Sequence, residues 1–369
     1  MHIGLIHDEE RIAREQSMLH RLIVGLIDEG AQITRLSPQT VNAGDDDAEQ
    51  SIALATRVEY APRVLPWLHR SRIERLREAF ERSRPDILLA CGQQTWPIVM
   101  PLAKAIDRPV AIEIWSVSQI SVAARLRPRQ QIAAYLAATE PMANELRGRV
   151  PSELVGCVPQ GVPVPRKARS VLRDDAEAIG IVCLGTCSDL RAYANLLPAL
   201  AEAVHGVPQI HVFLELDGPR EHQIWRLVRQ HGLADRITSI QRAAEHRDLL
   251  TDCDMILLPE QTGTASTLVL EAMANQLPII ARFDPFLDDF VHERTALLVQ
   301  DGVTREWLTA IERLLTQREF ARVLGRNGRE WIEEHHRSSA QASQLYRILT
   351  QALNGSALPF KRPEGTDGP

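Results

Sequence analysis

The stretch that decides the fold runs from Asp254 to Arg282 and reads DMILLPEQTGTASTLVLEAMANQLPIIAR. Residues 254–259 form a short apolar run bounded by Pro and Glu, which is typical of a buried strand in a parallel sheet. Small and hydroxylated residues follow at 261–266, and a helix with an apolar body begins after them. A Gln-Leu-Pro sequence ends this helix before an apolar strand at 279–281. The stretch therefore predicts one strand, loop, helix and strand unit of an α/β fold.

The loop at 261–266 has the properties of an anion site. The first N–H groups of a helix have no partner within the helix, and the helix dipole places positive charge at the same end. Small residues such as Gly263 and Ser266 also let a ligand approach the backbone. An ordinary junction between a strand and a helix has the same ends, so that alternative stays open on the pattern alone.

Length and composition narrow the class of protein. A chain of 369 residues exceeds what one hydrophobic core usually serves, so we expect two domains. The formal net charge of −6 argues against a nucleic-acid-binding protein, which would normally carry a strongly basic face. The cysteines show no CxxC spacing and lie mostly in apolar runs, which indicates reduced core residues. There is no leader pattern and no apolar run of about 18 residues, so we expect a soluble cytoplasmic protein.

Strands and helices alternate from the first residues onward. Residues 3–6 and 33–36 are predicted strands, and the helix between them, at about 12–29, repeats apolar residues at helical spacing. The connection after the first strand reads His7-Asp8-Glu9-Glu10-Arg11 and should repel a phosphate because it is acidic. It either faces a hydroxylated ligand or is a charged helix N-terminus. Further strands are predicted at 85–92 and 109–115.

A stretch rich in Pro and Arg, residues 163–175, has no periodicity and separates this region from a second series of strands and helices. We place the first domain at 1–165 and the second at 176–337. A helix at 338–353 is expected to pack back on the first domain. Residues 354–369, which are rich in Gly and Pro, are expected to form a disordered tail.

A basic segment lies between Arg57 and Arg84, with eight arginines against four glutamates. Ile73, Leu76 and Phe80 have the spacing of a core stripe, so one interpretation is an amphipathic helix whose arginines face water. The alternative is a docking patch for anionic lipid headgroups, which would make the protein peripheral at the inner face of a membrane.

Within the opening stretch, Pro259 and Glu271-Ala272-Met273-Ala274 stand at a separation found in a known signature. Together with the Leu-Pro-Ile-Ile-Ala run at 277–281, they resemble the donor-binding segment of the retaining family-4 (group 1) glycosyltransferases. In that family a second acid stands eight residues before the Glu, where this chain has Gly263. Thr264-Ala265-Ser266 also replaces a Gly-Phe-Gly run, so the motif is degenerate here.

The resemblance implies the GT-B architecture, in which two Rossmann-like doubly wound domains face each other across a cleft. It also implies a nucleotide-sugar substrate, with a UDP-sugar or GDP-sugar favoured, no cofactor and no metal. Glu271 would accept hydrogen bonds from ribose hydroxyls, and backbone N–H groups near Ser266 would hold the diphosphate. The donor-binding residues carried over from the family are Gly185, Thr186, Arg191, Gly263, Thr264, Ser266, Thr267, Leu268 and Glu271.

One departure from the family concerns the cations that neutralise the diphosphate. Relatives carry an Arg and a Lys at the positions of Thr186 and Arg191, so Arg191 keeps one charge and the other is missing. Glu260 lies close in sequence to the vacant acid position at Gly263 and is a candidate catalytic residue.

The first domain departs from the family pattern as well. Its first loop lacks the usual Gly-Gly pair, and Trp115 stands where an acceptor-side histidine is common. His7 is the candidate for that histidine, with His20 as a second one, although a lone histidine is more often structural. Asp8, Glu9 and Trp115 are predicted to lie on the acceptor side.

Two functions of different classes are consistent with these residues. The first is a retaining, metal-independent glycosyltransferase that moves a hexose from a nucleotide-sugar to a hydroxyl of a glycan or lipid-linked acceptor. The second is a non-catalytic GT-B-like binding or regulatory protein, because the substitutions fall on positions that would touch substrate. A dinucleotide oxidoreductase is disfavoured, because no GxGxxG motif follows a strand in either half.

Overall fold

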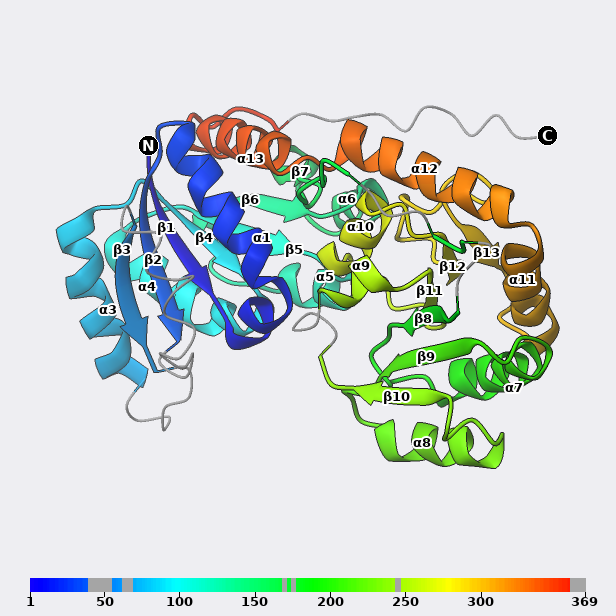
Figure 1. Cartoon of the computed structure of the whole chain (residues 1–369). Helices are drawn as coiled ribbons and strands as arrows, with labels where there is room; N and C mark the ends of the chain where they lie inside the picture. Colours follow the sequence, from blue (N-terminus) through cyan, green and yellow to red (C-terminus); the bar gives the residue numbers. More distant parts are fainter. Residues whose placement is uncertain (39–54, 62–68, 168–170, 174–176, 243–246, 359–369) are drawn as a thin grey trace. The chain divides into compact units, whose positions relative to one another are not determined.

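The computed structural model describes residues 1–38, 55–61, 69–167, 171–173, 177–242 and 247–358. The chain divides into two compact units: unit 1 is Met1–Pro159 with Ser338–Pro369, and unit 2 is Gln160–Arg337. Each unit is built on a parallel sheet with flanking helices (Figure 1). The α/β class and the pair of doubly wound sheets predicted from the sequence are confirmed.

The sheet of unit 1 has the strand order β3-β2-β1-β4-β5-β6-β7 in the described residues. The strands are β1 (His2–His7), β2 (Gln32–Pro38), β3 (Thr56–Tyr60), β4 (Ile87–Cys91), β5 (Val110–Ile114), β6 (Ile132–Ala137) and β7 (Val155–Cys157). The helices are α1 (Glu9–Asp28), α3 (His69–Ser83), α4 (Trp96–Ile106), α5 (Val117–Ala123), α6 (Glu140–Arg147) and α13 (Ser338–Leu353). The chain leaves β1 toward one edge and returns to β4 on its other side, so the order reverses between β1 and β4.

Unit 2 has the strand order β10-β9-β8-β11-β12-β13 in the described residues. The strands are β8 (Ile179–Cys183), β9 (Ile210–Glu215), β10 (Ile237–Ile240), β11 (Met255–Leu258), β12 (Ile279–Arg282) and β13 (Leu297–Val299). The helices are α7 (Leu190–Gly206), α8 (Glu221–Gln230), α9 (Leu249–Asp252), α10 (Thr267–Ala274), α11 (Thr304–Thr316) and α12 (Arg318–His335). Here the order reverses between β8 and β11, where Ile256 lies opposite Val182.

The stretch that opened the sequence analysis forms β11, a loop, α10 and β12, as predicted. Every residue of α10 is buried. The helix ends where Gln276 takes a positive φ of 64° and Pro278 leads into β12. Burial on all sides explains why its sequence, apart from Thr267 and Glu271, is apolar instead of amphipathic.

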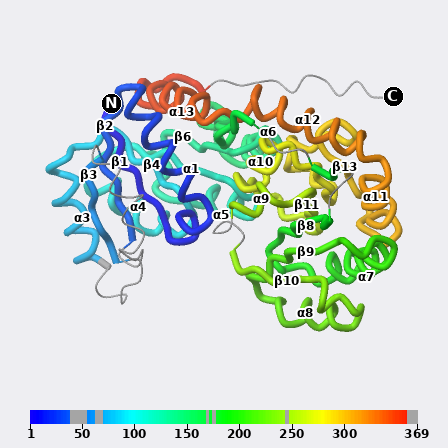
Figure 2. The backbone as a smooth tube through the Cα atoms, in the orientation of Figure 1, coloured from blue at the N-terminus to red at the C-terminus, as the bar shows by residue number. Residues whose placement is uncertain are grey.

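Helix α13 follows unit 2 in sequence but packs on α1 in unit 1, where the two helices lie side by side (Figures 1 and 2). Gly25 on α1 permits the close approach, since a Cβ built there would lie 2.6 Å from the Cβ of Ala342 on α13. Leu345 and Leu349 of α13 join the hydrophobic core of unit 1.

The boundary between the units lies after Pro159, earlier than the predicted residue 165. Gln160 and Val162 pack with unit 2, because the carbonyl of Gln160 accepts a hydrogen bond from His336 Nδ1 (2.7 Å) and Val162 N donates to the carbonyl of His336 (2.7 Å). His336 Nε2 lies 2.7 Å from Asp289 Oδ1. These contacts attach the segment after residue 159 to the end of α12.

The prediction of a disordered tail from residue 354 fails for its first residues. Leu358 is buried in the core of unit 1, and its N–H donates to the carbonyl of Glu153 at 3.0 Å. An apolar side chain that finds a core site orders the backbone before it, which composition alone does not reveal. Residues 359–369 lie outside the described residues.

The core stripe predicted within the basic segment is present, since Ile73, Leu76 and Phe80 are buried on α3. Residues 62–68 of that segment lie outside the described residues. Among the helices that the structure describes, none has the length and apolar character needed to cross a bilayer.

Candidate functional site

The candidate site of unit 2 lies where the strand order reverses, at the carboxyl ends of β8, β11 and β12. Ligands of open parallel sheets bind at such reversals, because the connecting segments diverge there and leave a crevice. We call the loops 184–189, 259–266 and 283–286 the unit 2 edge. The structure brings the predicted donor-binding residues to these loops or to the helices that follow them. Gly185 and Thr186 lie in the β8 loop, Arg191 in α7, Gly263, Thr264 and Ser266 in the β11 loop, and Thr267, Leu268 and Glu271 in α10.

The N-terminus of α10 is a regular helix start whose first N–H groups face the unit 2 edge. Ser266 is the N-cap residue with φ −135° and ψ 123°, and the first bond within the helix runs from Leu270 N to its carbonyl at 3.3 Å. Thr267 and Leu268, which form the first turn, are buried. The positive end of the helix dipole therefore points into the unit 2 edge.

Glu271 lies one turn into α10 and is 9% exposed. Its Oε2 lies 2.5 Å from Arg247 Nη1, and Arg247 Nη2 also donates to the Thr267 hydroxyl at 3.3 Å. Sequence reasoning missed Arg247, which lies in the connection before α9. Only the packing of Arg247 against α10 brings the cation to Glu271, so no local signal could have found it.

A carboxylate also lies beside the position where the family's first acid is missing. Gly263 has a positive φ of 55°, and its N–H donates to Asp284 Oδ2 at 2.6 Å. Asp284 follows β12, is 4% exposed, and accepts a second bond from Phe286 N at 3.0 Å. Asp284 was not predicted, since it lies 21 residues from Gly263 in sequence.

Glu260, the predicted catalytic candidate, is directed to a different loop. It is 8% exposed, and both of its carboxylate oxygens accept hydrogen bonds from the β8 loop, among them those from Ser188 N (2.8 Å) and Asp189 N (2.7 Å). The acid held next to Gly263 is therefore Asp284 and not Glu260.

The remaining predicted donor residues differ in exposure. Arg191 is exposed on the first turn of α7, and its backbone N–H donates to the N-cap residue Asp189 at 3.0 Å. Thr186 is half-buried, and its hydroxyl lies 2.7 Å from that of Ser188. The hydroxyl of Thr264 donates to the carbonyl of Thr262 at 3.3 Å.

In unit 1 the acidic loop after β1 forms a helix cap. Asp8 is the N-cap residue of α1 and is 2% exposed; Oδ1 accepts from Arg11 N at 2.7 Å and Oδ2 accepts from Gln94 N at 2.9 Å. Burial raises the pKa of the Asp8 carboxyl, while the two N–H donors act in the opposite direction. A Cβ at Gly92 would lie 2.2 Å from Asp8 Oδ2, so a glycine is needed there. Of the two interpretations of this loop, the structure favours a helix N-terminus. Glu9 is half-buried in the first turn.

His7 is buried, and neither ring nitrogen has a hydrogen-bond partner among the residues that the structure describes. Burial, with smaller contributions from Arg35 and Arg11, lowers the pKa of His7 to about 3, so the imidazole is neutral at physiological pH. Trp115 is also buried, and the Arg11 guanidinium carbon lies 5.0 Å from the centre of its ring. His20 is half-buried on α1.

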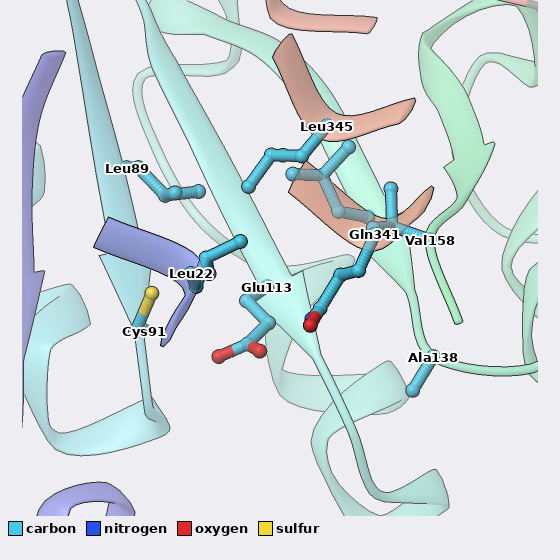
Figure 3. A pocket seen from close by; sticks show the side chains of 9 residues that line it. Leu22, Leu89, Cys91, Glu113, Ala138, Val158, Gln341 and Leu345 are labelled. Atoms are coloured by element: carbon cyan, nitrogen blue, oxygen red, sulfur yellow. The ribbon is translucent and has the colours of Figure 1, made fainter. Parts of the chain in front are cut away.

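Unit 1 also contains a small cavity of about 20 Å³, large enough for one water molecule (Figure 3). The polar side chains that line it are Glu113 and Gln341. Glu113 is tied to the buried Arg11, with Oε1 2.6 Å from Nη2 and Oε2 3.1 Å from Nε. The other lining residues are Leu22, Leu89, Cys91, Leu136, Ala138, Val158 and Leu345. The cavity is too small for a sugar.

Residues 170–331 match the family described as glycosyl transferases group 1. This segment belongs to that family. It covers most of unit 2 and includes Arg191, Arg247, Glu260, Glu271 and Asp284.

Curated relatives are similar over part of the chain. The uncharacterized glycosyltransferase YqgM of Bacillus subtilis is 23% identical over 171 residues, which are 46% of this chain and 48% of the relative. A GDP-mannose-dependent alpha-(1-6)-phosphatidylinositol monomannoside mannosyltransferase of Mycobacterium tuberculosis is 26% identical over 220 residues, which are 54% of this chain and 56% of the relative. The chain thus spans about half the length of these two relatives.

A solved structure extends the likeness of the fold to both units. Anabaena HepE, crystallised in complex with UDP-glucose, superposes with a TM-score of 0.75 over 95% of this chain and 100% of HepE, at 13% identity. The fold is therefore that of a two-domain glycosyltransferase, the GT-B class. The described residues contain no group of three or more His, Cys, Asp or Glu side chains placed to hold a metal ion.

Proposed function

We propose that this protein is a glycosyltransferase that moves a hexose from a nucleotide-sugar donor, held by unit 2, to a hydroxyl of a glycan or lipid-linked acceptor. The observation that carries the proposal is the pair of Glu271 and Arg247 at the start of α10, inside the segment that belongs to the group 1 family. HepE, the structural neighbour with UDP-glucose, and the GDP-mannose-dependent relative support a UDP-sugar or GDP-sugar as donor.

In this proposal Glu271 accepts hydrogen bonds from the ribose hydroxyls of the donor. The diphosphate is held by the N–H groups around Ser266, Thr267 and Leu268, with Arg247 and Arg191 as the nearby cations. Negative charge grows on the diphosphate as the bond to the sugar breaks. Fixed N–H donors and guanidinium groups stabilise that charge more in the transition state than in the bound substrate. Two cations at this edge make transfer without a metal feasible, and retention at the anomeric carbon follows the family resemblance.

Asp284 and Gly263 take the role of the missing acid in this account. The Gly263 N–H already donates to Asp284 Oδ2 at 2.6 Å, which fixes a carboxylate beside the position of the missing acid. A hydroxyl of the transferred sugar would donate to Asp284, so this residue would help to choose the sugar.

The acceptor would be recognised by unit 1, through residues at the edge formed by the loops after β1, β4 and β5. With Asp8 and His7 buried, the residues of that edge left to face an acceptor include Glu9, which is half-buried. The arginines between residues 57 and 84 would support a peripheral contact with anionic lipid at the cytoplasmic face of a membrane. Such a contact suits a lipid-linked acceptor.

The second candidate is a non-catalytic binding protein of the same fold. The observation in its favour is that Glu260 fills the β8 loop, at the edge where a donor would bind. Such a protein would bind a nucleotide-sugar, or a related ligand, without turning it over.

The test is a thermal-shift screen of UDP, GDP, ADP and their hexose conjugates, followed by detection of nucleoside diphosphate release from any conjugate that binds, with glycan and lipid-linked acceptors supplied to take the hexose. A ligand at a hundred times its Kd should stabilise the protein by roughly 2.7 kcal/mol. Stabilisation and release with one nucleotide-sugar, both lost in Glu271→Ala but kept in the exposed control Glu312→Ala, supports the transferase. Binding without release supports the second candidate. No stabilisation by any compound contradicts the donor site.

A further inference from the structure

Glu260 is held by the loop that follows β8 and not by its own neighbours in sequence. Its Oε1 accepts from Ser188 N (2.8 Å), Asp189 N (2.7 Å) and the Ser188 hydroxyl (3.1 Å). Its Oε2 accepts from Thr186 N, the Thr186 hydroxyl (3.0 Å) and the Tyr193 hydroxyl (3.4 Å). A single carboxylate thus accepts from three backbone N–H groups of this loop and from three hydroxyls.

The donors form a nest, a concave turn whose backbone N–H groups converge on one point. Such nests bind anions, because partial positive charges converge there. Cys187, within the turn, has a positive φ of 50°, and the backbone N–H groups of Thr186, Ser188 and Asp189 on either side of it all donate to Glu260. In this chain the bound anion is the side chain of Glu260.

The loop is shaped around this carboxylate. A Cβ built on Gly185 would lie 2.7 Å from Glu260 Oε2 and 2.2 Å from the Tyr193 hydroxyl, so only glycine fits at that position. The nest also lies at the β8 side of the strand reversal, while Glu260 comes from the β11 side. Glu260 therefore connects the loops on the two sides of the strand reversal, where a ligand of this fold would place its charged group.

We infer that Glu260 is an intramolecular anion that occupies the nest of Thr186, Ser188 and Asp189 and excludes phosphate groups from it. This inference rests on the proposed function. Because the nest is filled, the donor diphosphate would bind at the N-terminus of α10, Arg247 and Arg191. Glu260 is then a specificity-determining residue, because a second anion cannot share these N–H donors with the carboxylate. Removing the carboxylate opens a phosphate site that the native chain keeps closed.

The test is a calorimetric titration of inorganic pyrophosphate into the wild-type protein, Glu260→Ala and Glu260→Gln. The control is Glu202→Gln, which changes the charge equally at an exposed position on α7. We expect pyrophosphate to bind Glu260→Ala at least tenfold more tightly than the wild type. Glu260→Gln should gain less, because its amide still fills the space. The control should match the wild type. Equal affinity in all the proteins would overturn the inference.

Hydrogen exchange of the backbone amides locates the effect and covers the case of a poorly folded variant. In the wild type the amides of Thr186, Ser188 and Asp189 should exchange slowly. In Glu260→Ala, or in Glu260→Gln if only that variant folds, they should exchange faster, and pyrophosphate should restore their protection. Protection that is unchanged by the substitution would contradict the role of Glu260.

These results are separable from the test of the proposed function. Tighter pyrophosphate binding by Glu260→Ala, together with protection of the amides at 186–189, supports the closed nest. This holds even if no nucleotide-sugar binds the wild type. Conversely, nucleotide-sugar binding that depends on Glu271 supports the donor site even if Glu260→Ala gains nothing.

Discussion

The guanidinium of Arg247 lies 2.5 Å from the carboxylate of Glu271, which joins the connection before α9 to the body of α10. The family resemblance points to Glu271 but gives no partner for it, and it leaves one cation missing from the β8 loop. Arg247 supplies a positive charge at the same edge from a different element. If this edge holds the donor, as proposed, its second cation comes from packing and not from the motif.

If Arg247 helps to hold the donor, Arg247→Ala should weaken nucleotide-sugar binding. A hydrogen bond to a charged group contributes about 1.5–3 kcal/mol, which corresponds to about 10-fold to 100-fold in Kd. Arg226→Ala, which removes an exposed arginine from α8, is the matched control and should leave Kd unchanged. Calorimetric titration of both variants measures the difference, and equal affinities would show that Arg247 serves the fold alone.

Two glycines of α12 should respond in opposite ways to a methyl group. A Cβ at Gly325 would lie 2.0 Å from the carbonyl oxygen of Gln276, so Gly325→Ala must push α12 away from the end of α10. We expect a loss of about 1–3 kcal/mol or more in the free energy of unfolding. The nearest atom to a Cβ at Gly328 is 3.7 Å away, so Gly328→Ala should be neutral or gain about 0.5–1 kcal/mol. Urea denaturation of the two variants compares them, and similar losses would contradict the packing described for α12.

The buried ion pair of Arg11 and Glu113 should matter far more than an exposed pair of the same length. Arg11 Nη2 and Glu113 Oε1 are 2.6 Å apart with side-chain exposures of 0% and 15%. Glu145 on α6 and Arg149 in the turn after it are also 2.6 Å apart, with side-chain exposures of 40% and 49%. Glu113→Gln leaves a buried guanidinium short of negative charge and should cost about 3–5 kcal/mol. Glu145→Gln should cost about 0.5 kcal/mol or less.

Both substitutions remove one charge and keep the side-chain size, so their difference isolates burial. It is measured as the difference in free energy of unfolding from urea denaturation. Comparable costs for the two variants would mean that the Arg11 site is open to water.

His7 should make the fold sensitive to acid. Burial lowers its pKa to about 3, whereas the imidazole of an unfolded chain titrates near 6.5. Between these values the unfolded chain binds a proton that the folded chain refuses. The free energy of unfolding then falls, by about 1.36 kcal/mol for each pH unit, as the pH drops from 6.5 toward 3. His7→Leu should remove this slope, whatever its effect on stability at neutral pH.

The measurement is the slope of unfolding free energy between pH 6 and pH 4.5 in the wild type and His7→Leu. His222→Leu, which replaces an exposed histidine of α8, should keep the wild-type slope. An equal slope in the wild type and His7→Leu would mean that the imidazole is protonated in the folded chain.

The spacing of apolar residues, together with the Gly and Pro residues that end helices and strands, was enough to predict the elements with clear apolar patterns. The unit β11, loop, α10 and β12 follows from one stretch, because a buried strand and a fully buried helix both need continuous apolar residues. Strand β3 was not predicted, since its sequence TRVEY at Thr56–Tyr60 is charged and its side chains are largely exposed. A charged strand at the edge of a sheet carries no apolar signal, and its pairing with β2 depends on the rest of the sheet.

The site was predictable in position but not in its partners. The motif identified Glu271, and the order of strands explains why the residues carried over from the family meet at one edge. The contacts that define the site join distant parts of the sequence: Arg247 with Glu271, Asp284 with Gly263, and Glu260 with the β8 loop. None of these pairs has a local spacing that sequence patterns report, because the sheet alone brings them together.

The most direct test of the donor site is calorimetric titration of Glu271→Ala with the nucleotide-sugar that stabilises the wild type most. The account predicts that the wild type binds this donor, that Glu271→Ala binds it at least tenfold more weakly, and that the exposed control Glu312→Ala matches the wild type. Equal Kd values for Glu271→Ala and the wild type would contradict the assignment of the donor site to the start of α10.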